Sequence, residues 1–219
     1  MPNILVFDTE TSSLPLWSQP SESPEQPHIV QLAAYLMDAN TGQEVDRCVR
    51  YVKPDGWGIH SEALGAHGIT EDFARRHGIA EADVVQNFMD MVQHAAVISA
   101  FNVDFDLRIL RIALLRQGYP KTELDGWAAT INKYCVMRAS TPFAKAPPTD
   151  KMMATGRKAF KQPSLSEAVE AIFKVKMQGA HRANVDVRWT IKLHFWLNKL
   201  PEPKFNPDPP DEAVPGEEP

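Results

Sequence analysis

Four carboxylates stand where the residue pattern predicts buried faces. Asp8 and Glu10 are two residues apart at the end of a short apolar strand, so both side chains leave the same face of that strand. Asp106 and Asp186 each lead the apolar stripe of a predicted helix. A buried carboxylate is costly unless it is paired or neutralised, and no equal number of buried cations accompanies these acids. The four acids are therefore candidates for one common site.

Such a site would need positive charge from elsewhere. If four carboxylates converge, their charges repel one another unless divalent cations neutralise them. Carboxylate oxygens suit Mg²⁺ or Mn²⁺ rather than Zn²⁺. Two such ions about 3.5–4 Å apart can stabilise both the attacking and the leaving oxygen of a phosphodiester. The pattern predicts metal-dependent phosphodiester hydrolysis, although each acid taken alone is explained as well by a strand-end turn or by the helix dipole.

Asp104 competes with Asp106 for the third position in this set. Asp104 lies four residues before Arg108 and seven before Arg111, which places it on the solvated face of the predicted helix. A first-turn acid that pairs with Arg108 accounts for it fully. Asp106 is therefore the predicted ligand.

The elements that must position these acids follow from the hydrophobic periodicity. Three strands with a turn at residues 38–42 predict an antiparallel meander, and alternating helices and strands follow it. In chain order we expect strands over Ile4–Phe7, His28–Met37 and Val45–Lys53, a helical region over Ser61–His94, a strand over Ala95–Ala100, a helix over Phe105–Arg116, a fifth strand within Ala128–Val136, and helices over Ser164–Phe173 and Ala183–Leu200. This order predicts one mixed α/β domain over residues 1–200.

Two segments are predicted to lack regular structure. The stretch from Arg138 to Pro163 is rich in proline and in cations, which indicates a loop. Residues 201–219 contain seven prolines among 19 residues, together with six acids. Because such a segment buries too little apolar surface to offset the entropy of ordering, we expect a disordered acidic tail.

The charge of the chain is distributed unevenly. The net charge of −5 argues by itself against a nucleic-acid partner. Residues 1–130 carry nine Lys/Arg against 18 Asp/Glu, whereas residues 131–199 carry 13 against four. The average therefore conceals a basic segment, in which a polyanion could be bound.

Composition excludes several classes of protein. Cys48 and Cys135 are the only cysteines, which excludes a disulfide-rich scaffold and a cysteine-based zinc module. No apolar run reaches the roughly 20 residues of a membrane span, and the N-terminus lacks the features of a secretory signal. We expect a cytoplasmic protein that does not contact membranes.

Three motifs in order resemble the DnaQ-like (DEDDh) family of 3′–5′ exonucleases, in the RNase H-like superfamily. They are Phe7-Asp8-Thr9-Glu10-Thr11-Ser12-Ser13-Leu14, Phe101-Asn102-Val103-Asp104-Phe105-Asp106 and His181-Arg182-Ala183-Asn184-Val185-Asp186. The last has the HxAxxD form of the DEDDh branch. Ser13 departs from the glycine usual in the family, and Asp104 stands where an uncharged residue is commoner. The resemblance covers residues 3–200.

The resemblance implies a fold and a set of roles. The fold would be a mixed five-stranded sheet, with three antiparallel and two parallel strands, flanked by helices. Two Mg²⁺ or Mn²⁺ ions would be held by the four acids, and His181 would be the general base that takes a proton from the attacking water. The terminal nucleotide would contact Thr9, Thr11, Leu14, Phe105 and Asn102, with Phe105 expected to pack mainly in the core.

The basic segment supplies a candidate path for the rest of the strand. Five cations with two interleaved phenylalanines would follow phosphates and stack on bases, or would form an ordinary solvated face. The cations are Lys145, Lys151, Arg157, Lys158 and Lys161.

The leading hypothesis is a metal-dependent 3′–5′ exonuclease that releases nucleoside monophosphates from single-stranded or frayed DNA. It would act alone or beside a polymerase or repair partner, and the sequence leaves the oligomeric state open. An exoribonuclease of ribonuclease T or oligoribonuclease type is the alternative within the same chemistry, because no residue selects for or against a 2′-hydroxyl. A non-catalytic nucleic-acid-binding module is the third reading, but all five catalytic residues of the family are present.

Overall fold

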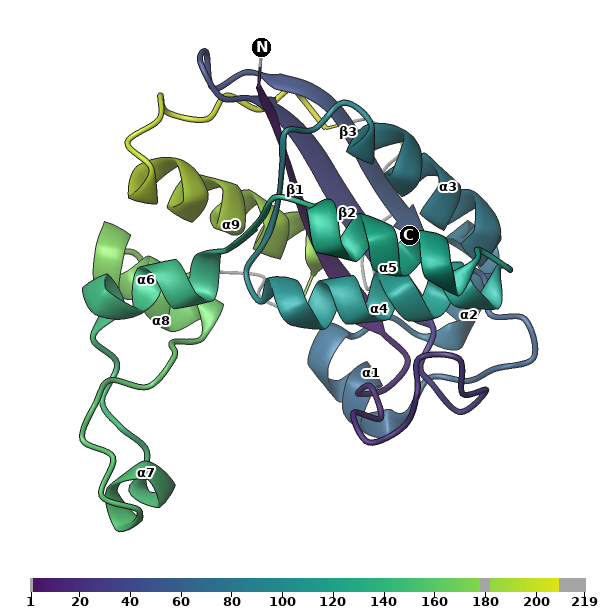
Figure 1. The fold of residues 1–219 in the computed structure, drawn as a ribbon, viewed down its shortest axis with the longest axis horizontal. Coiled ribbons are helices and arrows are strands. Elements are labelled where there is room, and N and C mark those ends of the chain that lie inside the picture. The colour runs from purple at the N-terminus through teal and green to yellow at the C-terminus, as the bar shows by residue number, and fades with distance from the viewer. Residues whose placement is uncertain (1, 178–181, 209–219) are drawn as a thin grey trace.

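The computed structural model of the chain describes residues 2–177 and 182–208 and contains a five-stranded sheet of order β3-β2-β1-β4-β5 (Figure 1). The strands are β1 (Asn3–Thr11), β2 (Ile29–Asp38), β3 (Glu44–Tyr51), β4 (Val97–Ala100) and β5 (Lys133–Cys135). β1, β2 and β3 pair antiparallel, whereas β4 pairs parallel with β1 and β5 pairs parallel with β4. The predicted mixed RNase H-like sheet is confirmed.

Helices cover both faces of this sheet. They are α1 (Ser61–His67), α2 (Glu71–His77), α3 (Glu81–Val92), α4 (Val103–Arg116), α5 (Lys121–Thr130), α6 (Val136–Ala144), α7 (Asp150–Ala154), α8 (Leu165–Phe173) and α9 (Ala183–Leu197). Figure 1 shows α3, α4 and α5 on one side of the sheet and α9 on the other. Each side therefore has its own apolar core, one under α3 and α4 and one under α9.

The central strand β1 contributes to both cores in alternation. Leu5 and Phe7 pack in the core with α3 and α4, whereas Ile4 and Val6 pack in the core with α9. All four side chains are buried. Because successive side chains of a strand point to opposite faces, the next even-numbered residues of β1 must also face the side of α9.

The predicted elements between Ser61 and Pro163 needed correction. The helical region over Ser61–His94 is three helices, because Gly68 and Gly78 end two of them and the Thr70 side chain caps α2. The fifth strand is only β5, because α5 extends to Thr130 and takes the first three residues of the predicted span, and α6 begins at Val136.

The predicted loop from Arg138 to Pro163 contains α7 and most of α6. Pro142 lies inside α6, a short helix that buries Val136 and Ser140 and packs against α8 and α9. Tertiary packing thus outweighs the hydrogen bond that proline removes from a helix. The Thr149 side chain accepts a hydrogen bond from the backbone N–H of Met152 (3.2 Å) and so caps α7.

The predicted disordered tail is wrong for its first eight residues. The backbone at Lys204 pairs with the turn between β2 and β3, and the Phe205 ring packs edge-on against Tyr35, with centroids 6.1 Å apart. Asp208 forms ion pairs with Arg47 and Arg188. A few specific partners therefore order a proline-rich segment whose composition predicts disorder. Residues 209–219 lie outside the described part of the chain.

The turn under this segment requires glycine. Gly42 has a φ of 73°, and a Cβ atom there would lie 2.4 Å from the backbone oxygen of Glu202.

Among the described residues, no helix is both long and apolar enough to cross a bilayer.

Candidate active site

Three of the four predicted acids converge at the end of β1. Ligand oxygens of Asp8, Glu10 and Asp186 all lie within 4.8 Å of one another. The two β1 acids continue the strand face whose earlier residues pack under α9, and Asp186 lies in the first turn of α9. Strand alternation and helix position therefore bring together residues separated by more than 170 positions in the chain.

Asp106 joins the cluster from the opposite face of the sheet. It lies in the first turn of α4 and is 3% exposed. The Thr9 backbone N–H and hydroxyl both donate to its Oδ1 atom, at 3.1 and 2.8 Å. Thr9 is the residue between the two β1 acids, so β1 supplies carboxylates on one face and the anchor for a further carboxylate on the other.

Burial and mutual repulsion dominate the electrostatics of the acid cluster. Burial, followed by repulsion from Asp106, Glu10 and Asp186, holds the pKa of Asp8 well above its usual range. Burial and the charges of Asp186 and Asp106 raise the pKa of Glu10 to about 8. Burial raises the pKa of Asp106 to about 7, although the two hydrogen bonds from Thr9 oppose the shift.

This donor set fits divalent metal ions. Added positive charge stabilises the ionised form of carboxylates whose pKa values are raised by burial and mutual repulsion. All the donors are oxygen atoms, which is the chemistry that Mg²⁺ and Mn²⁺ prefer. Asp8, Glu10 and Asp186 form the one such group among the residues that the structure describes.

A buried glutamine on β2 fixes the start of α9. Gln31 is 1% exposed and pairs with Glu10 across the β1–β2 register. Its side-chain oxygen accepts a hydrogen bond from the backbone N–H of Ala183 (3.2 Å), the first residue of α9. The contact orients the helix that carries Asp186. Gln31 was not predicted, because a polar residue in an apolar strand gives no signal of its partner.

The predicted nucleotide contacts gather around one surface pocket beside the acids. Thr9, Thr11, Leu14 and Phe105 all line it, together with Glu10. Phe105 also packs against the core under α4. One part of its side chain therefore lies in the core, as expected, and another part lines the pocket. Leu14 is 73% exposed at the rim.

The opposite wall of this pocket was not predicted. It is formed by α1 and the residue before it, through His60, Glu62, Ala63, Ala66 and His67. Sequence periodicity identified this segment as helical but gave no indication that it faces β1. Asn102 lies at the N-terminal boundary of α4 and outside the lining of the pocket.

Asp104 lies on the solvated face, as predicted, but pairs with other cations. Its carboxylate lies 2.9 Å from Lys133 Nζ and 2.9 Å from Arg138 Nη1. Arg108, the predicted partner, instead donates to the backbone oxygen of Gln19 (2.6 Å). The pairing depends on the position of β5 beside α4, which the sequence does not specify.

The predicted general base, His181, lies outside the described residues. The described part of its motif resumes at Arg182, which precedes α9, and includes buried Ala183. The sequence therefore places His181 five residues before Asp186, and its role stays a prediction.

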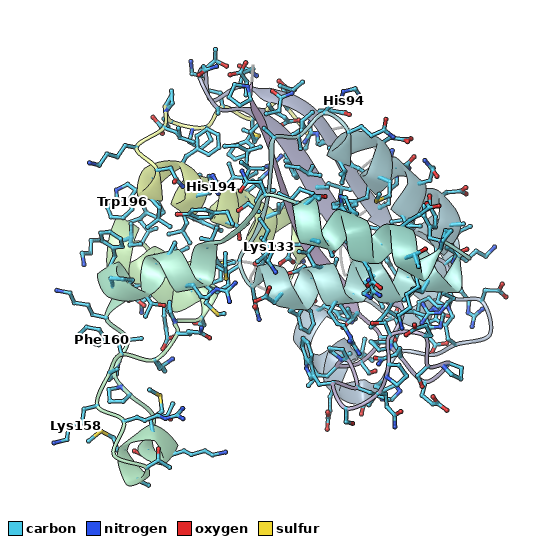
Figure 2. All side chains as sticks on the ribbon, viewed as in Figure 1. His94, Lys133, Lys158, Phe160, His194 and Trp196 are labelled. Atoms are coloured by element: carbon cyan, nitrogen blue, oxygen red, sulfur yellow. The ribbon has the colours of Figure 1, made fainter. Side chains whose placement is uncertain are left out.

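The predicted strand path lies on an arm that leaves the body of the protein, which we call the basic arm (residues 145–163). Figure 1 shows α7 at the far end of this arm, and Figure 2 shows Lys158 and Phe160 on it, away from the sheet. Lys151, Arg157 and Lys158 are exposed, and Lys145 ends α6 in a left-handed conformation. Lys161 differs, because its Nζ atom binds the carboxylate of Glu167 (2.6 Å).

The pairing of Lys161 has a local structural reason. Glu167 and Ser164 form a capping box at the start of α8, and Lys161 adds a third contact to that box. Its charge is therefore already matched, whereas the other cations of the basic arm have no ion pair among the described contacts.

Comparison with solved structures gives the same fold. Escherichia coli exonuclease I in complex with a dT13 oligonucleotide matches with a TM-score of 0.68 at 22% identity, over 90% of this chain and 41% of that one. Exonuclease I from Methylocaldum szegediense matches with a TM-score of 0.65 at 20% identity, over 91% and 41%. A product-bound exonuclease I structure matches with a TM-score of 0.67 at 21% identity, over 91% and 44%.

The chain thus spans about two fifths of the length of these exonuclease I chains. Curated protein sequences contain no significant match to it. The family model for RNase T exonucleases matches residues 5–194, which include the acid cluster, the pocket and the basic arm. The chain belongs to the RNase T exonuclease family.

Proposed function

We propose that this protein is a metal-dependent 3′–5′ exonuclease that removes nucleoside monophosphates from single-stranded DNA. The observation that carries the proposal is the convergence of Asp8, Glu10 and Asp186 beside a pocket of nucleotide size, with Asp106 anchored behind them. Buried carboxylates that raise one another's pKa are a costly arrangement for stability alone. Their cost is explained if they hold cations that act on a phosphodiester.

The four acids would hold two Mg²⁺ or Mn²⁺ ions. When bound, such ions would stabilise the charge on the attacking and leaving oxygens of the phosphodiester. Thr9 keeps Asp106 in one orientation through its two hydrogen bonds, so this ligand is pre-organised. His181 would take the proton from the attacking water, since an imidazole that titrates near neutral pH suits that task.

The terminal nucleotide would occupy the pocket beside Glu10. The backbone of Thr9 and Thr11 would contact its sugar and phosphate, and Leu14 and Phe105 would contact its base. The exposed cations of the basic arm would contact phosphates farther along the strand, so binding should weaken as salt is raised.

The comparisons support both DNA and RNA as candidate substrates, so both should be tested. Exonuclease I structures that match this fold contain DNA oligonucleotides, which supports DNA. The family takes its name from ribonuclease T, which supports RNA. The 2′-hydroxyl of each nucleotide distinguishes RNA from DNA. None of the described side chains that line the pocket identifies a specific binding site for this hydroxyl.

The deciding experiment compares single-stranded DNA and RNA of one sequence, labelled at either end, with Mg²⁺ and with EDTA. We expect immediate release of a 3′-terminal label as a mononucleotide, and stepwise shortening of the 5′-labelled strand. Asp8→Asn and His181→Ala should lose this activity. Asp104→Asn is the matched control, because Asp104 is an acid beside the site whose charge is already paired.

Absence of metal-dependent mononucleotide release from both polymers would overturn the proposed activity. Equal release by Asp8→Asn would overturn the assignment of the site. Loss of the 5′ label first would reverse the proposed direction.

A further inference from the structure

Trp17 forms an exposed apolar patch with two neighbouring leucines. Leu14, Leu16 and Trp17 are 73%, 41% and 61% exposed. Three of the ten large exposed apolar side chains in the described part of the chain thus lie within four residues. Such a concentration of exposed apolar surface marks a contact site more often than isolated exposed residues do.

The loop that carries this patch is held rigidly despite its exposure. Gln26, which is 2% exposed, accepts a hydrogen bond from the backbone N–H of Leu16 (3.0 Å) and donates to the carbonyl oxygens of Leu16 and Pro20, each at 3.0 Å. Arg116 donates to the carbonyl oxygens of Gln26 and Pro27, at 3.0 and 3.1 Å. The exposed side chains are therefore presented on a fixed support.

Trp17 itself is supported from one side by a cation. The guanidinium carbon of Arg108 lies 5.8 Å from the centre of the Trp17 ring, and Arg108 is fixed by its hydrogen bond to Gln19. A ring that is packed on a cation and open elsewhere is pre-ordered, so a planar ligand can stack on it with little further loss of entropy.

The patch begins at a residue that lines the pocket beside Glu10. Leu14 lines that pocket, and Trp17 follows it by three residues, a reach of at most about 10 Å. On α4, Phe105 lines the same pocket and Arg108 lies one helical turn farther along. Trp17 therefore follows Leu14 along one segment that lines the pocket, and it contacts Arg108 on α4, the helix that carries Phe105.

We infer that Trp17 is a stacking platform for a base of single-stranded nucleic acid, about three nucleotides from the end that occupies the pocket. The maximum reach of about 10 Å from Leu14 corresponds to three nucleotides at a stacked rise of about 3.4 Å per nucleotide. Stacking on an aromatic ring is tolerant of sequence, because every base has a π-face. This inference rests on the proposed function, since it requires a nucleic-acid end in the pocket.

A binding measurement tests it without relying on hydrolysis. In an Asp8→Asn background we would measure the Kd of a fluorescently labelled thymidine octanucleotide (dT8) by anisotropy. Trp17→Ala should raise the Kd roughly 5- to 100-fold, and Trp17→Phe should restore most of the affinity. Trp196→Ala is the matched control, because Trp196 is 45% exposed on α9, ten residues beyond Asp186.

A kinetic measurement on the otherwise unmodified protein separates this inference from the proposed function. Trp17→Ala should raise KM for dT8 by a similar factor and should leave hydrolysis of a dinucleotide unchanged, because a dinucleotide ends before the platform. If Trp17→Ala left the Kd and KM for dT8 unchanged, the stacking platform would be overturned. Hydrolysis of dT8 by the parent protein would still support the proposed activity. Failure of the Asp8→Asn protein with Trp17 intact to bind dT8 would also overturn the stacking platform. An equal effect of Trp17→Ala on the dinucleotide would assign Trp17 to the terminal nucleotide instead.

Discussion

Two polar clusters lie at opposite ends of α9 and differ in how their polar groups are satisfied. Near the start of the helix, Asp186 meets Asp8 and Glu10 from β1, and the cluster has like charges at close range. Near its end, His194 meets Ser99 from β4, and Ser99 Oγ lies 2.9 Å from His194 Nδ1. Each cluster joins α9 to a central strand of the sheet.

The second cluster is an ordinary piece of core. Ser99 and His194 are 0% and 3% exposed, and the ring of Tyr134 packs edge-on against the imidazole, with centroids 4.5 Å apart. Burial lowers the pKa of His194 to about 4, so the ring is neutral at physiological pH and forms one hydrogen bond with the serine hydroxyl. Figure 2 labels His194 on α9, toward Trp196. Burial of a titratable group does not by itself indicate catalysis.

The difference lies in countercharge. The Ser99–His194 pair completes its hydrogen bond within the protein, whereas the acids hold one another in unfavourable protonation states. A cation from solution would relieve the repulsion in the acid cluster, whereas the Ser99–His194 pair carries no such repulsion. Substitutions in the acid cluster should therefore change hydrolysis and metal binding, whereas substitutions in the Ser99–His194 pair should change stability.

The largest effect is expected from Asp8→Asn. Hydrolysis should fall by about 10³-fold or more, because loss of a shared metal ligand removes several kcal/mol of transition-state stabilisation. The metal-free variant should be at least as stable as the parent, since one repelling charge is gone. Initial rates and urea unfolding in EDTA would measure the two effects. A variant that retained most activity would place the chemistry elsewhere.

Metal addition should stabilise the protein only through the acid cluster. At a Mg²⁺ concentration of about 100 Kd the free energy of unfolding should rise by about 2.7 kcal/mol, which corresponds to a rise in Tm of roughly 5–10 °C. Asp8→Asn should abolish the shift, and Ser99→Ala should keep it. Thermal melts in EDTA and in Mg²⁺ provide the comparison. An equal shift in Asp8→Asn would mean that the ion binds outside this cluster.

Ser99→Ala should destabilise the fold and spare the chemistry. Without the hydroxyl, buried His194 Nδ1 loses its partner, at a cost of about 1–3 kcal/mol. Specific activity per folded molecule should stay within about twofold of the parent, because the pair lies at the other end of α9 from Asp186. Denaturant midpoints and active-site-normalised rates distinguish the two outcomes. A large loss of rate would contradict the structural role.

The smallest effect is a pH dependence of stability due to His194. Its pKa is about 4 in the folded protein and 6.5 when unperturbed, so between these values the unfolded chain binds the extra proton. Stability from this group should be complete above about pH 6.5 and should be lost progressively as the pH falls through about 4. Urea midpoints across this range should show a shallower slope in His194→Gln. An unchanged slope would assign the acid sensitivity to other groups.

The sequence alone determined which acids belong together. Two residues of one strand, spaced by two, must share a face, and an acid that leads a helical apolar stripe must face the core. Asp8, Glu10 and Asp186 therefore lie together as expected, and Asp106 is buried against Thr9 whereas Asp104 lies on the solvated face. These inferences needed only the local period of a strand or a helix.

Long-range contacts decided the remainder. Nothing in the local pattern indicates that Thr9 anchors Asp106, that Gln31 holds the start of α9, or that α1 closes the nucleotide pocket. Each contact joins residues from different elements, and its partner is set by how those elements pack. The proline-rich segment after Leu200 shows the same limit, because Phe205 and Asp208 are ordered by distant residues on β2, β3 and α9.

The division has a simple physical reason. The periods of strands and helices are properties of the backbone, so the sequence determines which side chains face the core and which acids cannot be satisfied there. Which residues lie within hydrogen-bonding or ion-pairing distance depends on crossings between elements, which only the tertiary structure specifies. The sequence by itself thus determined that the chain carries acids on faces that its local pattern directs toward the core. The tertiary structure decided what orients those acids and what walls the pocket beside them.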